Sequence, residues 1–220
     1  DLLATVHSVS KTVPVIALVN ELNSDHIAAS IGVDWREMGR VAGEFLAARH
    51  PVGSPRIRAG FATGREASGW SPLLESGLRN SLLESSVDIV VTRHADTGMR
   101  EQLREVEGIL KERSDLDYLI GSAPAIEGAM GLSARSNALF PKMIATYISH
   151  SVRRGLQSGK VLAAPFDDPI EQGRLGLQAA LQAVSGTTTP QMQGPKIKLI
   201  AGALPEEMPL SPANFTLRIE

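Results

Sequence analysis

Short apolar runs alternate along the chain with longer stretches whose apolar residues recur at helical spacing. The runs that we predict to be β-strands are 13–18, 31–34, 57–62, 87–91, 118–121, 143–146, 161–164, 196–201 and a last one at 214–219. A linker is expected at 186–190, which is rich in glycine, threonine and proline. The clearest predicted helix follows Asp168, which can cap the first turn and is followed by Pro169, a residue suited to the first helical position. Strands that alternate with helices in this way predict an α/β fold with parallel sheets and right-handed crossovers.

Uncommon side chains follow several of these predicted strands. Trp70 lies in the loop after 57–62, Ser122 follows 118–121, Tyr147 follows 143–146, and Asp167 follows 161–164. Because the carboxyl ends of parallel strands meet at one edge of a sheet, we expect these side chains to face one crevice. Trp35 follows 31–34, where the chain is expected to cross between sheets. These five residues are the predicted ligand-binding set, although a single aromatic residue could equally well pack in a core.

Composition limits the classes of partner. The chain has 220 residues, 43% of them hydrophobic, which is enough for one large domain or two small lobes. Its 22 basic and 24 acidic residues give a net charge of −2 and form no basic run, which argues against a nucleic-acid surface. The sequence has no run of about 20 apolar residues, so direct membrane insertion is not expected. The absence of cysteine excludes disulfides and is compatible with an oxidising compartment.

Motifs for catalysis, metals or cofactors are weak, so we predict that the chain is not an enzyme and needs no cofactor. The five histidines have no spacing that places two on one helical face as metal ligands. Ser149 and His150 could form a nucleophile and base, but adjacent side chains point in different directions, and His150 is better explained as a helix-start residue. The segment 60–64 lacks the third glycine of a dinucleotide fingerprint.

The start of the chain suggests that earlier elements are missing. Residues 1–10 are typical of the last turns of a helix, and the next strand, 13–18, already has the apolar character of a central strand. We therefore expect the chain to be a fragment or a mature form without its first elements.

Several segments resemble the type I periplasmic binding proteins, and in particular their TorT branch. They are VPVIALVN, IGVDWREMGRVAGEFL, Ser68-Gly69-Trp70, LDYLIGSA and IATYISHSVRRGLQSGKVLAAPFDDPIEQGRLG, which together cover most of residues 13–200. The resemblance implies two lobes joined by three crossovers. Residues 1–34 and 168–200 would form a partial first lobe, residues 35–167 the second lobe, and residues 201–220 a C-terminal crossover tail.

The same resemblance implies a function. Sugar-binding relatives carry charged and amide groups where this chain has Val19-Asn20, Trp70, Ser122 and Tyr147, so a sugar ligand is not expected. An aromatic wall with the Asp167 carboxylate suits a small methylated amine, because aromatic faces attract such cations. The resemblance implies a periplasmic protein that senses trimethylamine N-oxide or a similar molecule and signals to a membrane sensor histidine kinase. The alternatives are the substrate-binding component of an ABC uptake transporter and the effector domain of a LacI-type regulator.

Overall fold

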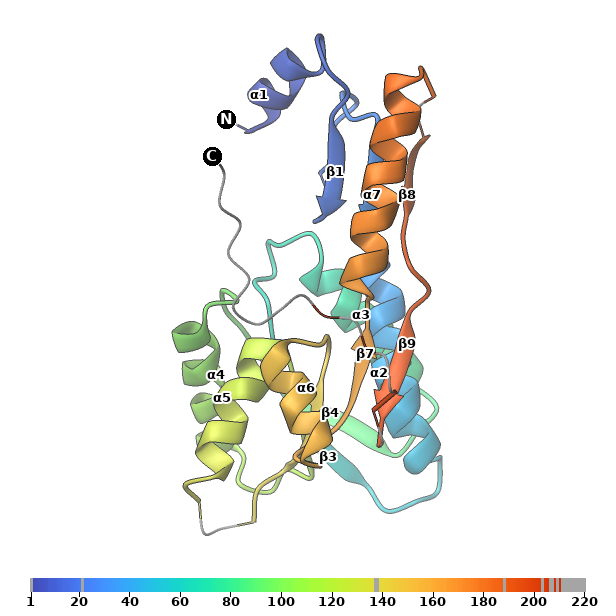
Figure 1. The fold of residues 1–220 in the computed structure, drawn as a ribbon. Helices are drawn as coiled ribbons and strands as arrows, with labels where there is room; N and C mark the ends of the chain where they lie inside the picture. The colour runs from blue at the N-terminus through green and yellow to red at the C-terminus, as the bar shows by residue number, and fades with distance from the viewer. Residues whose placement is uncertain are drawn as a thin grey trace. The chain divides into compact units, whose positions relative to one another are not determined.

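The computed structural model describes residues 2–20, 22–136, 139–187, 189–202, 204, 205, 208 and 210. It has an α/β fold with mostly parallel sheets flanked by helices (Figure 1). The elements are, in order, α1 (Leu2–Val9), β1 (Ile16–Val19), β2 (Ala29–Gly32), α2 (Trp35–Arg49), β3 (Ile57–Thr63), α3 (Ser71–Leu82), β4 (Val87–His94), α4 (Met99–Glu112), β5 (Tyr118–Gly121), α5 (Ala123–Ser133), β6 (Lys142–Ala145), α6 (His150–Gln157), β7 (Val161–Phe166), α7 (Pro169–Val184), β8 (Thr189–Gln193) and β9 (Lys198–Ala201). None of the helices among these described residues is both long and apolar enough to cross a membrane.

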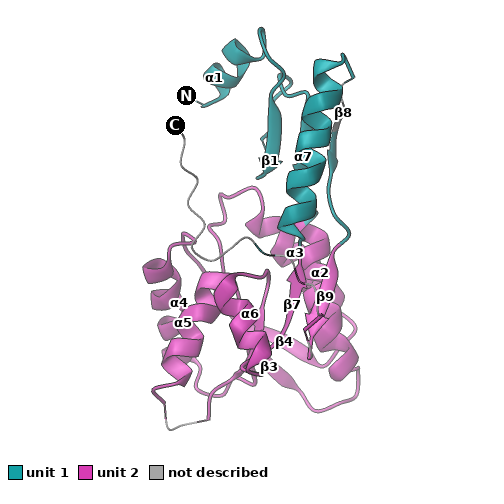
Figure 2. Ribbon diagram, viewed as in Figure 1, with its two compact units in different colours: residues 1–34, 167–196, 209–220 teal, residues 35–166, 197–208 magenta. Residues whose placement is uncertain are grey.

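The chain divides into two compact units (Figure 2). Unit 1 comprises the described parts of residues 1–34, 167–196 and 209–220, and unit 2 those of residues 35–166 and 197–208. Unit 1 contains a parallel sheet of order β1-β2-β8, on which α7 packs. Its small core contains Ile31, Ala29 and Ala179.

Unit 2 contains a six-stranded sheet of order β4-β3-β5-β6-β7-β9. All its neighbouring strands are parallel except β7 and β9, which pair antiparallel. The order reverses at β3, because β4 lies on one side of it and β5, β6 and β7 follow on the other. Open α/β sheets bind ligands beyond the carboxyl ends of their strands at such a reversal. The fold thus marks the loops after β3, β5 and β6 as the candidate region.

Two layers of helices flank the sheet of unit 2. Helices α4, α5 and α6 pack side by side on one face, and α2 and α3 pack closely together on the other (Figure 1). Glycines make the second contact close: a Cβ on Gly39 would lie 1.9 Å from the Leu74 carbonyl oxygen, and one on Gly77 would lie 1.9 Å from the Arg36 carbonyl oxygen. Because residues near the start of α2 contact residues near the start of α3, the two helices run parallel. Their first residues therefore lie at the same end.

The structure differs from the expected elements in two places. Residues 186–190 were expected to form a linker, yet β8 begins at Thr189 and extends the sheet of unit 1. Strand β9 was expected to be part of the first lobe, yet it pairs with β7 in unit 2. A single sequence does not indicate which strand a short strand pairs with, and this explains both differences. The last predicted strand, 214–219, lies outside the described residues.

Candidate functional site

Three of the five predicted ligand-binding residues form a cluster of aromatic rings in unit 2. The ring centroids of Trp35 and Trp70 are 5.1 Å apart, and that of Tyr147 lies 6.3 Å from Trp35 and 6.4 Å from Trp70. The tyrosine ring is nearly perpendicular to both indoles, at 82° and 89°. All three side chains are half-buried. We call Trp35, Trp70 and Tyr147 the aromatic cluster.

The helix pair explains why the two indoles meet. Trp35 is the first residue of α2, and Trp70 is the N-cap of α3. Since the glycines of α2 and α3 allow these parallel helices to pack closely, their first residues are brought together. Tyr147 reaches the same place from the loop after β6. Chain segments far apart in the sequence thus meet at the carboxyl edge of one sheet.

The Trp70 indole lies directly over Gly64. A Cβ at Gly64 would be 2.4 Å from the Cζ2 atom of Trp70, so only glycine leaves room for the ring. The two ends of the intervening loop are also held together, because the Ser71 hydroxyl donates to the Gly64 carbonyl oxygen at 3.0 Å and lies 3.0 Å from Thr63 Oγ1. The position of the indole is therefore set by the loop beneath it.

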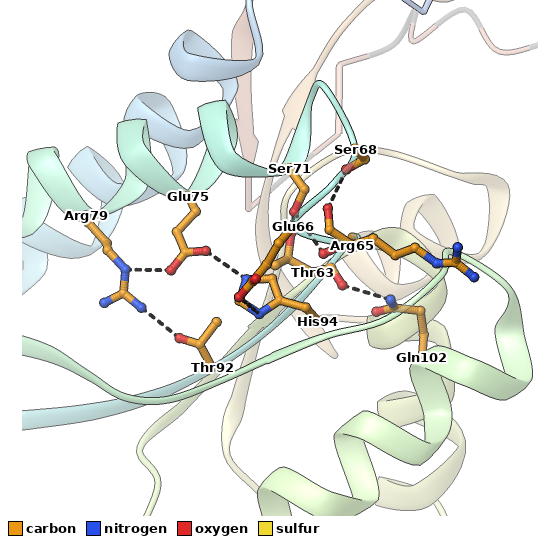
Figure 3. A network of polar contacts seen from close by, with 11 residues as sticks. Thr63, Arg65, Glu66, Ser68, Ser71, Glu75, Arg79, Thr92, His94 and Gln102 are labelled. Atoms are coloured by element: carbon orange, nitrogen blue, oxygen red, sulfur yellow. Dashed lines mark hydrogen bonds and ion pairs between the residues drawn. The ribbon is translucent and has the colours of Figure 1, made fainter.

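Charged groups secure the same loop to its surroundings (Figure 3). His94 at the end of β4 lies between two carboxylates, 3.5 Å from Glu66 of the loop and 3.0 Å from Glu75 of α3. Burial would raise the pKa of Glu75, but hydrogen bonds from His94 and Arg79 outweigh it and lower the pKa. Arg65 pairs with Asp96 at 2.8 Å. These contacts tie the loop that carries Trp70 to β4 and α3.

Gln102 is a buried polar residue that connects the carboxyl ends of β3, β4 and β5. Its amide nitrogen lies 2.9 Å from the carbonyl oxygen of Thr63 at the end of β3, and 3.1 Å from those of Ala95 and Asp96 after β4. Its amide oxygen accepts a hydrogen bond from Ser122 Oγ at 2.9 Å. Gln102 was not among the predicted site residues, although its spacing from Val106 and Ile109 places all three on the buried face of α4.

The other two predicted residues lie in different settings. Ser122 is fully buried, caps α5 by accepting from the Ala125 amide at 3.3 Å, and donates to Gln102. It therefore supports the sheet edge from inside. Asp167 belongs to unit 1, where Gln172 donates to its carbonyl oxygen at 2.7 Å and to its carboxylate at 3.3 Å. Burial raises the pKa of the Asp167 carboxyl, and these and other hydrogen bonds offset this only in part.

The two residues considered for catalysis have structural roles. Ser149 caps α6, because its Oγ accepts a hydrogen bond from the Val152 amide at 3.2 Å, and His150 is the first residue of that helix. The prediction that His150 begins a helix is confirmed. Within the part of the chain that the structure describes, no group of three or more histidine, aspartate or glutamate side chains could hold a metal ion.

Similarity to known proteins agrees with this architecture. No protein-family model matches the chain. The periplasmic protein TorT of Escherichia coli K12 is 29% identical over 189 residues, which are 86% of this chain and 54% of TorT. A chain in the crystal structure of the TorS sensor domain–TorT complex in the presence of TMAO is 31% identical, with a TM-score of 0.81 over 92% of this chain and 70% of that chain. This chain belongs to the type I periplasmic binding protein family.

A second type I binding protein is similar at the same level. An ABC transporter solute-binding protein from Bradyrhizobium sp. BTAi1, solved with bound Bis-Tris, is 30% identical, with a TM-score of 0.78 over 91% of this chain and 61% of that protein. The chain spans about half the length of the curated relatives it matches. The comparisons thus confirm the predicted family and its TorT-like character.

Proposed function

We propose that this chain is part of a periplasmic binding protein that senses trimethylamine N-oxide or a similar methylated amine and signals to a membrane sensor histidine kinase. The aromatic cluster is the observation that carries the proposal. Faces of tryptophan and tyrosine attract methylated ammonium groups through the ring quadrupole, at roughly 0.5–2 kcal/mol per ring. Rings set nearly perpendicular to one another offer such a group more than one face. The similar structure of the TorS sensor domain–TorT complex, solved in the presence of TMAO, supports this ligand class, and the similarity to the periplasmic protein TorT supports a periplasmic location.

We further propose roles for the individual residues. Trp35, Trp70 and Tyr147 would contact the methyl groups, and Asp167 of unit 1 stays a predicted ligand residue. Ser122 would act indirectly, because its hydroxyl is engaged by Gln102 and the cap of α5. The structure of the TorS sensor domain–TorT complex supports a sensor kinase as the partner.

Calorimetric titration of the protein with trimethylamine N-oxide tests the proposal. Trp70→Ala should weaken binding by about two- to thirtyfold, because one ring contributes roughly 0.5–2 kcal/mol and about 1.4 kcal/mol corresponds to tenfold. Trp70→Phe should retain part of the affinity. Leu83→Ala is a matched control, since Leu83 is an exposed apolar residue at the other end of α3. Equal affinities for the wild type and Trp70→Ala would reject the aromatic cluster as the ligand site.

A transport function is the second candidate, because the ABC transporter solute-binding protein from Bradyrhizobium is about as similar to this chain as the chain in the TorS–TorT complex. In that case the ligand-bound protein would associate with an ABC permease. Co-purification of the ligand-loaded protein with a sensor kinase or with a permease distinguishes the two functions. A gene for a permease beside this one would favour transport.

A further inference from the structure

Unit 2 contains a hollow at the edge of the sheet opposite the aromatic cluster. Ile57, Tyr118 and Lys142, the first residues of β3, β5 and β6, line it, so it lies at the amino ends of the parallel strands. Its volume is about 660 Å³. Cavities of roughly 300–1,000 Å³ are typical of small-molecule sites. The hollow is therefore large enough for a ligand of its own.

A hydrogen-bonded pair of rings lies against this hollow. His50 Nε2 is 2.9 Å from the Tyr118 hydroxyl, and the two ring centroids are 5.4 Å apart at 74°. Burial, assisted by the nearby Lys142, lowers the pKa of His50, and burial raises the pKa of Tyr118. Both rings are accordingly neutral near pH 7. They offer a ligand polar atoms without an opposing charge.

The charges around the hollow leave one cation available. Asp115 pairs with Arg113 at 2.9 Å and with Arg58 at 3.2 Å, and the Asp117 carboxylate accepts the Arg58 amide at 2.8 Å. Lys142 Nζ instead lies 5.6 Å from the centroid of the Tyr118 ring. Among the described residues, no carboxylate forms an ion pair with Lys142. Lys142 is therefore the lining cation without an ion pair, and the nearby Asp117 carboxylate is held by a backbone amide rather than by a cation.

The rest of the lining is largely apolar. Its apolar side chains are Ile57, Leu110, Leu116, Leu139, Phe140 and Pro141. Leu139 is fully exposed and Phe140 half-buried, so apolar surface faces solvent beside Lys142. An apolar surface next to a single cation matches a molecule with an apolar body and one negative charge.

We propose that this hollow is a second binding site, for a small organic acid with an apolar body. The carboxylate would meet Lys142, and the body would pack against Tyr118, Phe140 and the neighbouring aliphatic side chains. A contact between an ammonium and a carboxylate is among the stronger hydrogen bonds in proteins. The site is separate from the proposed amine site, because it lies at the other edge of the sheet.

The test uses 3-phenylpropionate and its neutral amide, 3-phenylpropanamide, with binding followed by ¹H–¹⁵N NMR. The acid should shift the amide signals of residues 114–118, 139, 140 and 142, and its binding should saturate in the micromolar to millimolar range. The amide should bind roughly tenfold more weakly, because it lacks the charge that Lys142 pairs with. Lys142→Met should weaken binding of the acid by a similar factor.

Two control variants show whether the acid binds in this hollow rather than elsewhere on the protein. Lys160→Met should leave binding of the acid unchanged, because Lys160 is an exposed lysine before β7 that does not line the hollow. Trp70→Ala should also leave it unchanged, so the result does not depend on the proposed amine site. Equal affinity for acid and amide, full binding by Lys142→Met, or no saturation with the acid at millimolar concentration would overturn the proposal.

Discussion

The position of the Trp70 indole depends on the absence of a Cβ atom at residue 64. The ring lies over Gly64, where any side chain would collide with it, and the loop between the two residues is closed by Ser71. The sequence predicted that Trp70 would lie at the carboxyl edge of the sheet. It did not indicate the role of Gly64, because the contact depends on how the loop folds back.

We expect Gly64→Ala to displace the indole and weaken binding of trimethylamine N-oxide. Its Cβ would be 2.4 Å from a ring carbon, and overpacking of this kind costs about 1–3 kcal/mol of stability. Denaturant unfolding and calorimetric titration measure the two effects. Gly131→Ala is the matched control, since a Cβ there meets nothing within 4 Å and helical alanine is favoured over glycine. Unchanged affinity in Gly64→Ala would contradict this role.

The raised pKa of Asp167 predicts how stability and ligand binding depend on pH. Its carboxyl pKa is raised above 3.8 in the folded protein. Between 3.8 and the raised pKa, the folded protein therefore holds a proton that the unfolded chain has released. As the pH rises through this interval, the group lowers the free energy of unfolding. If Asp167 contacts the ligand, a cation such as tetramethylammonium should bind more tightly as pH rises through the same interval, because the carboxyl ionises. Asp167→Asn should remove this increase, and calorimetry at several pH values measures it. A wild-type affinity independent of pH would argue against Asp167 as a ligand residue.

At the scale of elements, the packing of α2 against α3 and the link through Gln102 hold the candidate site together. The alternation of apolar runs and amphipathic stretches predicted the strand ends that carry the candidate residues and the helix that follows Asp168. Gln102 was missed because hydrophobic patterning places polar residues on the solvent side, whereas this amide is buried to satisfy the carbonyl groups of Thr63, Ala95 and Asp96. The glycine contacts between α2 and α3 could not be predicted without knowing that the helices are neighbours.

We expect Gln102→Leu to lower the free energy of unfolding by about 1–3 kcal/mol, because buried carbonyl groups and Ser122 lose their partner. The change should also weaken ligand binding, since Gln102 joins the ends of β3 and β5 beside the cluster. Urea unfolding followed by circular dichroism gives the stability. Gln157→Leu, at an exposed position of α6, serves as the control and should change it by less than about 0.5 kcal/mol. Similar stabilities of the two variants would contradict the structural role of Gln102.

At the scale of the whole molecule, the chain passes from unit 1 to unit 2 after Asp34, returns after Phe166, and passes again after Lys196. The α/β architecture could be predicted because its strands and helices have strong local patterns, whereas the two lobes were implied only by the family resemblance. The partners of β8 and β9 could not, since pairing between distant short strands leaves no local signal. The TorT-like resemblance came from motifs that span both units, and the sequence and structure comparisons confirm it.

The central claim is that the aromatic cluster binds a methylated amine. The chain has two tryptophans, and both belong to the cluster, so tryptophan fluorescence reports on this site alone. We predict that trimethylamine N-oxide changes the emission saturably, whereas tert-butanol, which has nearly the same shape but no positive nitrogen, does not. A change that is equal and non-saturating for both compounds, or no change with either, would contradict the account.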